Sequence, residues 1–464
     1  MSHKPKVAVV IVNWNKKDDV MRLLNSLKYV DYENCDIIVV DNASTDGSVE
    51  AIREQFPEVE LIINPENLGG TGGFNSGMRY ALQKAEYQYI WLLDNDAEVE
   101  ESTLEELINV MERDERIGIA GSRIIDSVNR DITVEAGAYL MRDSIGVQPL
   151  YRNIKNLNIA SSVMEVDYVA ICSALARTSA LEKVGLMDER YFFFWDDMDW
   201  GLQFRDKGFK IISVLNSIVY HPAFTEKRGI LVDYYYGNRN SLLTYAKHNG
   251  LAKRISIFYI YLRQKCTSLI LLGLIGNGYT MNLGFEGIFD FVSGKWGKRT
   301  SSGRLDEAPG KQAELPGRAE KVLVLNDGSR EEIYDALNCL LKVYPDSEYT
   351  LLISDDRTDL FDKGFRDLIK IDTKRPYSLF YCLSVFVNVL FKKFDISISF
   401  KNTSPFSYTT RKSYTFDSGT KSFYETYNNS KNIWKLILSA IVGETMGILL
   451  LPLLWVSSLK YKKT

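Results

Sequence analysis

Short apolar runs alternate with stretches of helical spacing along the first part of the chain. Residues 7–13 ("VAVVIVN") form a continuous apolar run, and similar runs follow in "CDIIVVD", "VELIINP" and "YIWLLD". Between the first two runs, Val20, Leu23 and Leu27 stand at helical spacing. Continuous runs are typical of strands buried on both faces, and strands that alternate with helices form mostly parallel sheets. We therefore predict an α/β fold with a doubly wound, Rossmann-like sheet.

Polar residues follow the first, second and fourth of these runs, at the sheet edge where α/β proteins bind ligands. Asp94 and Asp96 stand one residue apart after "YIWLL", so both carboxylates can reach one divalent cation. The alternative is a turn with acids that cap a helix. His221 follows another apolar run and is a candidate for a third metal ligand, or a structural residue at a strand end.

Two further polar segments are candidates for binding a nucleotide. Asp41 ends the second run, where an acid can bond a base or ribose, or can belong to a turn that caps the next helix. The segment "NLGGTGGFNSG" places Gly69, Gly70, Gly72 and Gly73 together, before a helical stretch. Such a loop lets backbone amides approach a phosphate or a base, although the segment matches neither GxGxxG nor a Walker A loop. The alternative is a flexible turn.

Acids directly follow an aromatic cluster in "YFFFWDDMDWGLQ" (191–203). Aromatic walls partly desolvate a carboxylate, which raises its pKa towards the range of a useful general base. In an extended or bent loop, Asp196 and Asp197 would point to opposite sides, so that one is held by structural hydrogen bonds while the other faces a cleft as the base. The alternative is the start of a helix, where Asp197 or Asp199 interacts favourably with the helix dipole. Both interpretations can hold together.

The remainder of the chain predicts further segments. Residues 297–320 are rich in Gly, Pro, Ser and charge, as in a linker, and "KVLVLN", "YTLLIS" and "DISISF" then predict a second, smaller α/β unit. We predict the following division: a catalytic α/β domain over 1–250, a helical extension over 251–296, the linker over 297–320, the small α/β domain over 321–430 and an apolar segment over 431–464.

Two apolar segments suggest a membrane surface as a partner. Residues 254–276 are apolar but interrupted by Arg-Gln-Lys at 263–265, which favours an interfacial helix or a helix packed on the catalytic domain. Residues 436–456 approach the ~20 residues needed to span a bilayer, but contain Glu444 and Pro452. A membrane-associated helix or re-entrant hairpin, a spanning helix and a buried oligomer interface are all compatible with this segment.

Composition narrows the class of protein. The chain has 464 residues with 56 basic and 60 acidic side chains, and the net charge of −4 does not suggest a nucleic-acid binder. Its five cysteines are scattered without a CxxC pair, which predicts a reduced, cytoplasmic protein rather than a disulfide framework. The first apolar run is too short for a secretory signal.

The motifs, taken in order, resemble those of family 2 glycosyltransferases with the GT-A fold. The stretches that carry the resemblance are "VVIVNWN", "VVDNASTDGS", "NLGGTGGFNSG", "WLLDNDAE", "FFFWDDMDWGLQFRDKGFKI" and "VYHP". They cover roughly residues 5–250, and the branch that includes rhamnosyltransferases and galactofuranosyltransferases is the most similar. The resemblance implies a donor such as a UDP- or dTDP-sugar, and a glycan or lipid-linked glycan as acceptor, at the cytoplasmic face of a membrane.

The resemblance also implies roles for single residues. Asp94 and Asp96 would hold Mn²⁺ or Mg²⁺ with the donor diphosphate, and His221 would be an additional metal ligand. The nucleotide-sugar site would further include four residues of the first, second and Gly-rich motifs: Asn13, Asp41, Asn67 and Gly70. In the "FWDD" motif, Asp197 would be the general base of an inverting single displacement, with Asp196 and Trp195 shaping the acceptor site.

Two other functions compete with this interpretation. A nucleotidyltransferase on a similar scaffold would need a basic, phosphate-binding loop after the first strand, where this chain has Asn13, Trp14 and Asn15. A non-catalytic scaffold that binds nucleotide sugars would keep its cellular role after loss of Asp197. Association of the chain with itself is a further expectation.

Overall fold

The computed structural model describes the chain in eleven stretches: residues 4–155, 162–222, 231–274, 278–299, 315–325, 330–354, 367–371, 394–399, 412–417, 422–428 and 433–459. The chain forms two compact units. The first consists of Met1–Leu262, Asn282–Ser302 and Ile448–Thr464, and the second of Arg263–Met281 and Gly303–Gly447. The predicted boundaries at residues 250, 296 and 320 therefore stay predictions, because both units draw on the helical extension.

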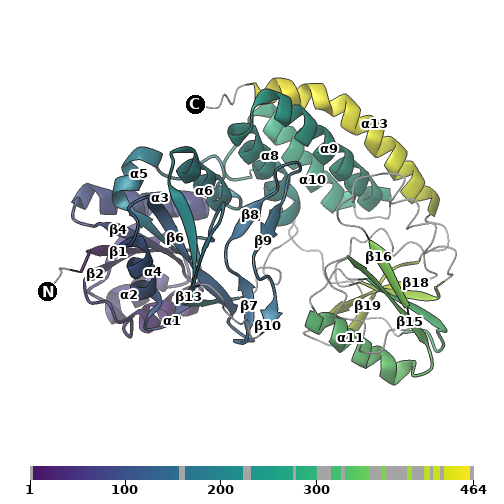
Figure 1. The fold of residues 1–464 in the computed structure, drawn as a ribbon, viewed down its shortest axis with the longest axis horizontal. Coiled ribbons are helices and arrows are strands. Elements are labelled where there is room, and N and C mark those ends of the chain that lie inside the picture. Colours follow the sequence, from purple (N-terminus) through teal and green to yellow (C-terminus); the bar gives the residue numbers. More distant parts are fainter. Residues whose placement is uncertain are drawn as a thin grey trace. The chain divides into compact units, whose positions relative to one another are not determined.

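A mostly parallel sheet forms the centre of the first unit (Figure 1). Its principal strands are β1 (Val7–Asn13), β2 (Cys35–Asp41), β3 (Glu60–Ile63), β4 (Tyr89–Asp94), β6 (Ile117–Asp126), β12 (Ser173–Arg177) and β13 (Lys210–His221). β1 pairs in parallel with both β2 and β4, and β13 pairs in parallel with β6. β12 lies antiparallel between β4 and β6. This arrangement confirms the predicted α/β sheet and brings the ends of β1, β2 and β4 to one edge.

Shorter strands extend this sheet. They are β5 (Glu98–Val99), β7 (Ile132–Glu135), β10 (Ile154–Lys155) and β11 (Val163–Glu165). A separate two-stranded sheet consists of β8 (Ala138–Leu140) and β9 (Val147–Pro149).

Helices cover both faces of the main sheet. They are α1 (Lys17–Leu27), α2 (Ser48–Gln55), α3 (Gly69–Lys84), α4 (Thr103–Met111), α5 (Thr178–Val184) and α6 (Asp196–Asp206). Val9 of β1 belongs to a core with Leu23 of α1, whereas its neighbour Val10 belongs to a second core with Met78 of α3. Successive residues of a strand point to opposite faces, so the uniformly apolar β1 has packing partners on both.

The Gly-rich segment is not a loop, which corrects the prediction of a loop before the helix. Helix α3 starts at Gly69, so the glycines lie within the helix itself. A Cβ on Gly73 would lie 2.5 Å from Cγ1 of Val12, and one on Gly77 would lie 2.3 Å from Cγ1 of Val10. Glycine normally weakens a helix interior, but here it lets the helix approach β1 closely.

Further helices follow the sheet: α8 (Gly237–His248), α9 (Leu251–Leu274), α10 (Gly278–Ser293) and the late helix α13 (Ile433–Ser458), with a π-helical turn at η1 (Leu231–Tyr236). Within the first unit, Nη1 of Arg254 donates to the carbonyl of Ser458, and the hydroxyl of Ser457 donates to the carbonyl of Phe291 at 3.3 Å. These bonds attach the last turns of α13 to α9 and α10.

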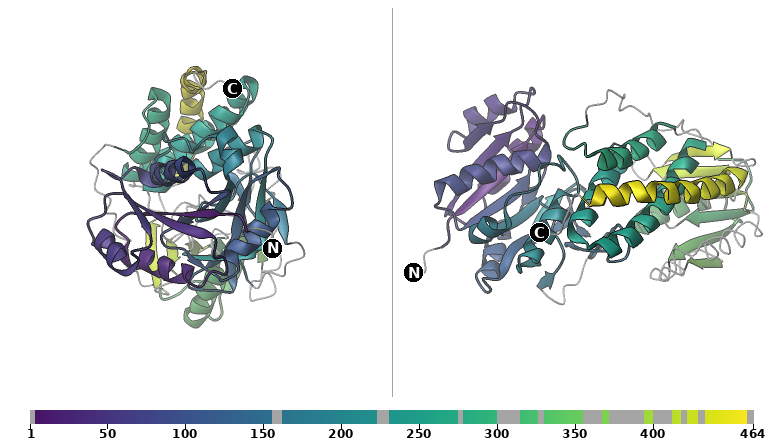
Figure 2. Two further views of the ribbon diagram at one scale, coloured as in Figure 1. Left: turned by 90° about the vertical axis from the view of Figure 1, so that its left-hand side faces the viewer. Right: turned by 90° about the horizontal axis from the view of Figure 1, so that it is seen from above.

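Helix α13 settles part of the prediction for the apolar segment. It runs as one uninterrupted helix (Figure 2), so the interpretation as a re-entrant hairpin is wrong. Among the residues that the structure describes, none of the helices combines the length and the apolar character needed to cross a bilayer.

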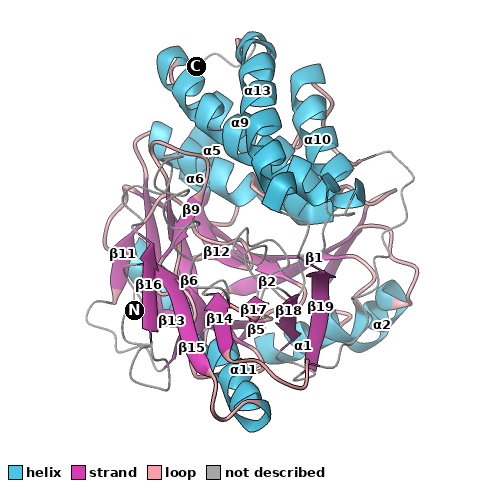
Figure 3. Cartoon of the chain, turned by 90° about the vertical axis from the view of Figure 1, so that its right-hand side faces the viewer, coloured by secondary structure: helices cyan, strands magenta, loops and turns pink. Residues whose placement is uncertain are grey.

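The second unit contains a smaller α/β sheet, as predicted (Figure 3). Its elements are β14 (Lys321–Leu325), α11 (Arg330–Val343), β15 (Glu348–Ser354), β16 (Asp367–Ile371), β17 (Ile396–Ser399), β18 (Lys412–Asp417) and β19 (Ser422–Asn428). All strand pairs are parallel except β18 with β19. Ile333 and Leu337 of α11 pack against Val322 of β14. Most of the predicted linker lies outside the described residues.

Candidate active site

The three predicted metal ligands meet at one edge of the main sheet. Asp94 ends β4, Asp96 follows in the next turn, and His221 ends β13. Nε2 of His221 lies 2.9 Å from Oδ1 of Asp96 and 3.7 Å from Oδ2 of Asp94. One ligand atom from each of the three residues lies within 4.8 Å of the others. Two carboxylates and an imidazole are a donor set that fits Mn²⁺ or Mg²⁺.

His221 is held in the orientation that a metal ligand needs. Its Nδ1 donates to the carbonyl oxygen of Pro222 at 2.7 Å, which leaves Nε2 facing the two acids. Burial lowers the pKa of His221, but hydrogen bonds to Asp94 and Asp96 raise it, to about 10 on balance. Without a cation, the positive charge of the protonated imidazole therefore offsets part of the negative charge of the two carboxylates. A divalent cation held by the three residues would do the same.

Asn13 connects the ends of β1, β2 and β4 at this edge. Its Nδ2 donates to Oδ2 of Asp41 at 3.0 Å and to the hydroxyl of Ser44 at 3.3 Å. Its Oδ1 accepts from Nδ2 of Asn95, which stands between the two metal-binding acids, at 3.0 Å. Asn13 is completely buried. The side chain therefore fixes the "DND" turn relative to the end of β2.

Asp41 is also completely buried, and both of its oxygens have partners within the chain. Oδ2 accepts from Asn13, and Oδ1 accepts the backbone N–H of Ser44 at 2.7 Å. The carboxylate thus organises the loop after β2. Its predicted contact with a nucleotide stays a prediction, and such a contact would use the lone pairs that these bonds leave over.

Asn67 and Gly70 lie at the start of α3. Oδ1 of Asn67 accepts the backbone N–H of Gly69 at 2.8 Å, which is a capping bond at the helix N-terminus. Gly70 has space beside it, since a Cβ there would lie 3.6 Å from Cδ2 of Phe193. Gly69 is the constrained glycine, because it has φ +75° and a Cβ would lie 2.0 Å from the carbonyl oxygen of Phe192. The nucleotide contacts predicted for Asn67 and Gly70 stay predictions.

The acids after the aromatic cluster occupy the first turn of α6, and their environments differ. Asp196 is buried, and its Oδ2 accepts the hydroxyl of Thr71 at 2.6 Å. Burial raises the pKa of Asp196, and the hydrogen bond from Thr71 lowers it in part. Asp197 is only half-buried, and its Oδ1 accepts the backbone N–H of Met198 at 2.8 Å. Asp197 is therefore the more accessible of the pair.

The third acid, Asp199, serves more than the helix start. It is completely buried, and its oxygens bond Nζ of Lys247 at 2.5 Å and Nε2 of His248 at 2.8 Å. Burial raises the pKa of Asp199, but Lys247 and His248 outweigh it, so the pKa lies below its usual value. This ion pair fastens α6 to the end of α8.

Charge effects connect the acids of α6 with the metal ligands. Besides burial, the charge of Asp94 raises the pKa of Asp196. Burial raises the pKa of the Cys172 thiol, and the charges of Asp94, Asp96 and Asp197 raise it further. The charge of Asp94 therefore acts on Asp196, and the charges of both groups of acids act on the buried Cys172.

Trp195, the predicted acceptor residue, is 6% exposed. Its ring lies edge-on to that of Tyr245, with 6.1 Å between the centroids. Phe193, in contrast, is 46% exposed. Trp195 thus packs inside the fold, and its contact with an acceptor stays a prediction.

Sequence reasoning missed several residues that hold the site. Thr71 bonds Asp196, and Asn95 bonds Asn13. In α8, Arg239 and Asn240 bond the backbone of the aromatic cluster. The only signal for the last two was the run "GNRNS", which places polar residues at the start of a predicted helix.

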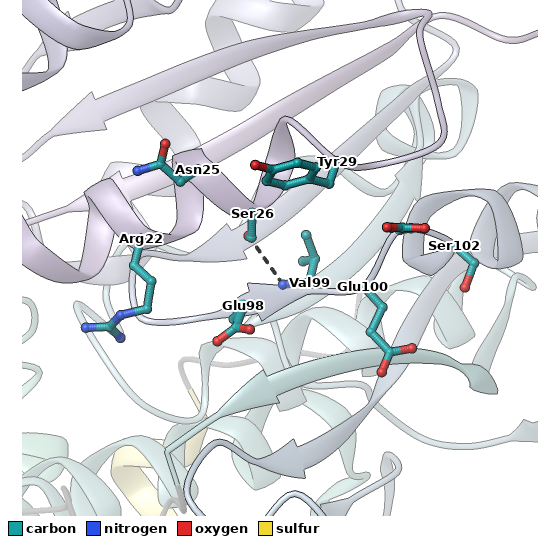
Figure 4. A pocket seen from close by; sticks show the side chains of 9 residues that line it. Arg22, Asn25, Ser26, Tyr29, Glu98, Val99, Glu100 and Ser102 are labelled. Atoms are coloured by element: carbon teal, nitrogen blue, oxygen red, sulfur yellow. Dashed lines mark hydrogen bonds between the residues drawn. The ribbon is translucent and has the colours of Figure 1, made fainter.

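A surface pocket lies on another part of the first unit, between α1 and the segment from β5 to α4 (Figure 4). Its volume is about 710 Å³, and its lining includes Arg22, Tyr29, Glu98 and Glu100, but none of the residues above. Glu98 pairs with Arg130, and Glu100 accepts the hydroxyl of Tyr220. These two acids are thus engaged in contacts within the fold.

Comparison with known sequences identifies the N-terminal region. Residues 8–185 match the family described as "Glycosyl transferase family 2". A low-salt glycan biosynthesis hexosyltransferase of Haloferax volcanii is 22% identical over 211 residues, which are 44% of this chain and 63% of that protein. An N-acetylglucosaminyl-diphospho-decaprenol L-rhamnosyltransferase of Mycobacterium tuberculosis is 25% identical over 232 residues, which are 46% of this chain and 75% of that protein.

Two further similarities are more partial. A galactofuranosyltransferase of Mycobacterium tuberculosis is 23% identical over 198 residues, which are 39% of this chain and 31% of that protein. Among solved structures, a mannosyltransferase from Pyrobaculum calidifontis has 16% sequence identity and a TM-score of 0.39, covering 63% of this chain and 76% of that one. On the family match and the sequence relatives, residues 8–185 of this chain form a glycosyltransferase family 2 domain.

Proposed function

We propose that the chain transfers a hexose from a nucleotide-diphosphate sugar to a hydroxyl of a glycan or lipid-linked glycan, in a metal-dependent reaction with inversion. The observation that carries this proposal is the cluster of Asp94, Asp96 and His221 at the sheet edge, where one ligand atom from each residue lies within 4.8 Å of the others. A leaving diphosphate and an attacking hydroxyl need a cation and a base, respectively.

The chain's own residues divide the work of the reaction. Asp94, Asp96 and His221 would hold Mn²⁺ or Mg²⁺, and a bound cation would neutralise charge on the departing diphosphate. Asp197 takes the proton of the acceptor hydroxyl while that oxygen bonds to the anomeric carbon and the bond to the diphosphate breaks. Asp196, held by Thr71, keeps the start of α6 in place. Attack opposite the leaving group inverts the anomeric centre.

Galactofuranose and rhamnose are the favoured sugars, carried by UDP or dTDP. The names of two relatives support this choice, because one is a rhamnosyltransferase that acts on a decaprenol-linked acceptor and one is a galactofuranosyltransferase. Transfer of either sugar fits a role of this chain in the synthesis of a cell-surface polysaccharide.

An apolar surface on the first unit supports a membrane-bound acceptor. Four residues in the last part of α13 expose more than half of their surface: Ile448, Leu449, Leu453 and Val456. Leu251 and Ile255 of α9 are also exposed, at 44% and 39%. An exposed apolar face on a helix is suited to lying in the bilayer interface, here the cytoplasmic face. A second copy of the chain is the other occupant to test.

Binding to vesicles separates these two occupants. The variant Leu449→Glu/Val456→Glu should lose co-flotation with vesicles of phosphatidylglycerol and phosphatidylethanolamine, while its mass in solution stays unchanged. A fall in mass from dimer to monomer would instead assign the surface to self-association. If the variant floats with the vesicles to the same extent as the wild type, the membrane proposal is contradicted.

A donor screen tests the reaction itself. UDP-galactofuranose, dTDP-rhamnose, UDP-galactose and UDP-glucose are each supplied with octyl glycoside acceptors, with Mn²⁺ or with EDTA. We expect one donor to release its nucleoside diphosphate and form a glycosylated product, only with the metal. Release of pyrophosphate would indicate a nucleotidyltransferase. Tight donor binding without turnover, and with cellular function intact in Asp197→Asn, would indicate a binding scaffold.

A further inference from the structure

The aromatic segment before the catalytic acids has an unusual backbone. Phe192, Phe194 and Trp195 have φ values of 64°, 69° and 71°. Bulky residues rarely adopt this left-handed conformation, which persists only where the surrounding structure imposes it. We define residues 190–195 as the aromatic loop. Since Asp196 and Asp197 follow directly, whatever imposes this conformation also sets the position of the proposed base.

Two residues of α8 bind the backbone of this loop. Nδ2 of Asn240 lies within hydrogen-bond distance of the carbonyl oxygens of Tyr191, Phe193 and Phe194, at 3.1, 2.9 and 2.7 Å. Nη2 of Arg239 donates to the carbonyl of Tyr191 at 3.1 Å. Both side chains are completely buried. We call Arg239 and Asn240 the α8 clamp.

Arg239 is itself held from several sides. Its Nε donates to Oδ1 of Asn240 at 2.9 Å, and this bond turns the amide nitrogen of Asn240 towards the loop. Its Nη1 donates to the carbonyl of Gly297 at 2.8 Å. The guanidinium also lies 5.2 Å and 5.0 Å from the ring centroids of Tyr235 and Tyr236. The clamp is therefore rigid, and it depends on residues well beyond the family match.

The opposite side of the loop rests on α3. The carbonyl of Phe192 accepts the backbone N–H of Thr71 at 3.3 Å, and the hydroxyl of Thr71 bonds Asp196. The loop is thus held between α3, within the family match, and α8, which lies beyond that match.

We propose that Arg239 and Asn240 are positioning residues for the transfer reaction, and that α8 completes the active site by holding the aromatic loop. This inference rests on the proposed function. A misplaced base slows the chemical step, because a shift of about 1 Å at a reacting group can cost about 10²-fold in rate. The predicted metal ligands, and the predicted nucleotide contacts Asn13 and Asp41, lie on β1, β2, β4 and β13 or in the turn after β4, so we expect donor binding to change little.

The variant Asn240→Ala tests the clamp, with Asn238→Ala as the matched control. Asn238 is a buried asparagine of the same helix, but it bonds the carbonyl of Gly284 and the hydroxyl of Tyr261 instead of the loop. At a temperature where circular dichroism shows both variants folded, Asn240→Ala should lower kcat about 100-fold with the donor KM within twofold. Asn238→Ala should keep kcat within threefold. Equal values of kcat for the two variants would overturn the proposal.

Hydrogen exchange measured by mass spectrometry gives a readout besides activity. Asn240→Ala should speed the exchange of amides 191–198 at least tenfold, with residues 7–41 unchanged, and Asn238→Ala should not. Unchanged exchange in 191–198 would overturn the proposal whether or not the enzyme turns over. If the wild-type chain processes none of the four nucleotide sugars while Asn240→Ala still loosens the loop, the transfer reaction fails and the clamp as a structural device stands.

Discussion

The predicted metal ligands and the proposed base are held in place by different structural means. Asp94 and His221 end regular strands, β4 and β13, so the hydrogen bonds of the sheet place them. Asp196 and Asp197 follow a loop with three left-handed aromatic residues that contacts on both sides maintain. Strand ends therefore supply a rigid binding edge, whereas the base depends on packing between distant segments. The two halves of the site should respond differently to mutation.

Removal of the metal ligands should have the largest effect. The variant Asp94→Asn/Asp96→Asn loses the charge that attracts a divalent cation, and with it several kcal/mol of stabilisation of the leaving group. We expect kcat/KM to fall by about four orders of magnitude, and the donor to bind with the same affinity in Mn²⁺ and in EDTA. Steady-state kinetics measure the fall in kcat/KM. Isothermal titration calorimetry with the donor and with Mn²⁺ alone measures the affinities. A variant that keeps metal-stimulated turnover would contradict the assignment of this edge.

Loss of the base should come next and should spare the metal. Asp197→Asn keeps the size of the side chain but cannot take a proton, so kcat should fall about 10³-fold, within the usual range for a general base. Donor affinity and its dependence on Mn²⁺ should match those of the wild type. Asp196→Asn serves as the comparison, and a larger loss there would exchange the roles of the two acids.

The sequence predicted one half of the site better than the other. The residues of the metal edge were found because acids and a histidine that directly follow apolar strands must lie at a sheet edge. The aromatic loop was found as a motif, but its supports were not, because Thr71, Arg239 and Asn240 contact it only through the tertiary fold. Likewise, the glycines of α3 were interpreted as a loop, since the close approach to Val10 and Val12 cannot be read from local sequence.

A smaller change sharpens the comparison at the loop's contact with α3. Thr71→Val removes the hydroxyl that bonds Asp196 and leaves a buried carboxylate with one bond fewer, which costs about 1.5–3 kcal/mol for a charged partner. We expect kcat of Thr71→Val to fall about tenfold. Thr71→Ser keeps the hydroxyl, so its kcat should match that of the wild type. Ser76→Ala is the control, because Ser76 lies in the same helix and its hydroxyl donates to the carbonyl of Gly72 and to Oδ1 of Asn64 instead of to the loop. An equal loss in both variants would mean that α3 acts through stability alone.

The smallest effect concerns the ion pair that joins α6 to α8, and it is one of stability. Burial lowers the pKa of His248, but Asp199 and Asp206 outweigh it, so the pKa lies above 6.5 in the folded chain. A histidine with a raised pKa stabilises the fold fully below the pKa of the unfolded state, near 6.5, and this contribution disappears as the pH rises through the folded value. Asp199 has a lowered pKa, so its stabilising contribution is complete above the pKa of the unfolded state and is lost only as the pH falls through the folded value.

The melting temperature of the wild type should therefore fall between pH 6 and pH 9. This fall should be about 2–4 °C larger than the fall measured for His248→Gln. His221 titrates in both proteins, so the difference between them isolates His248. If the two melting curves shift in parallel with pH, the ion pair does not secure α6, and the position of the base depends on the α8 clamp and Thr71 alone.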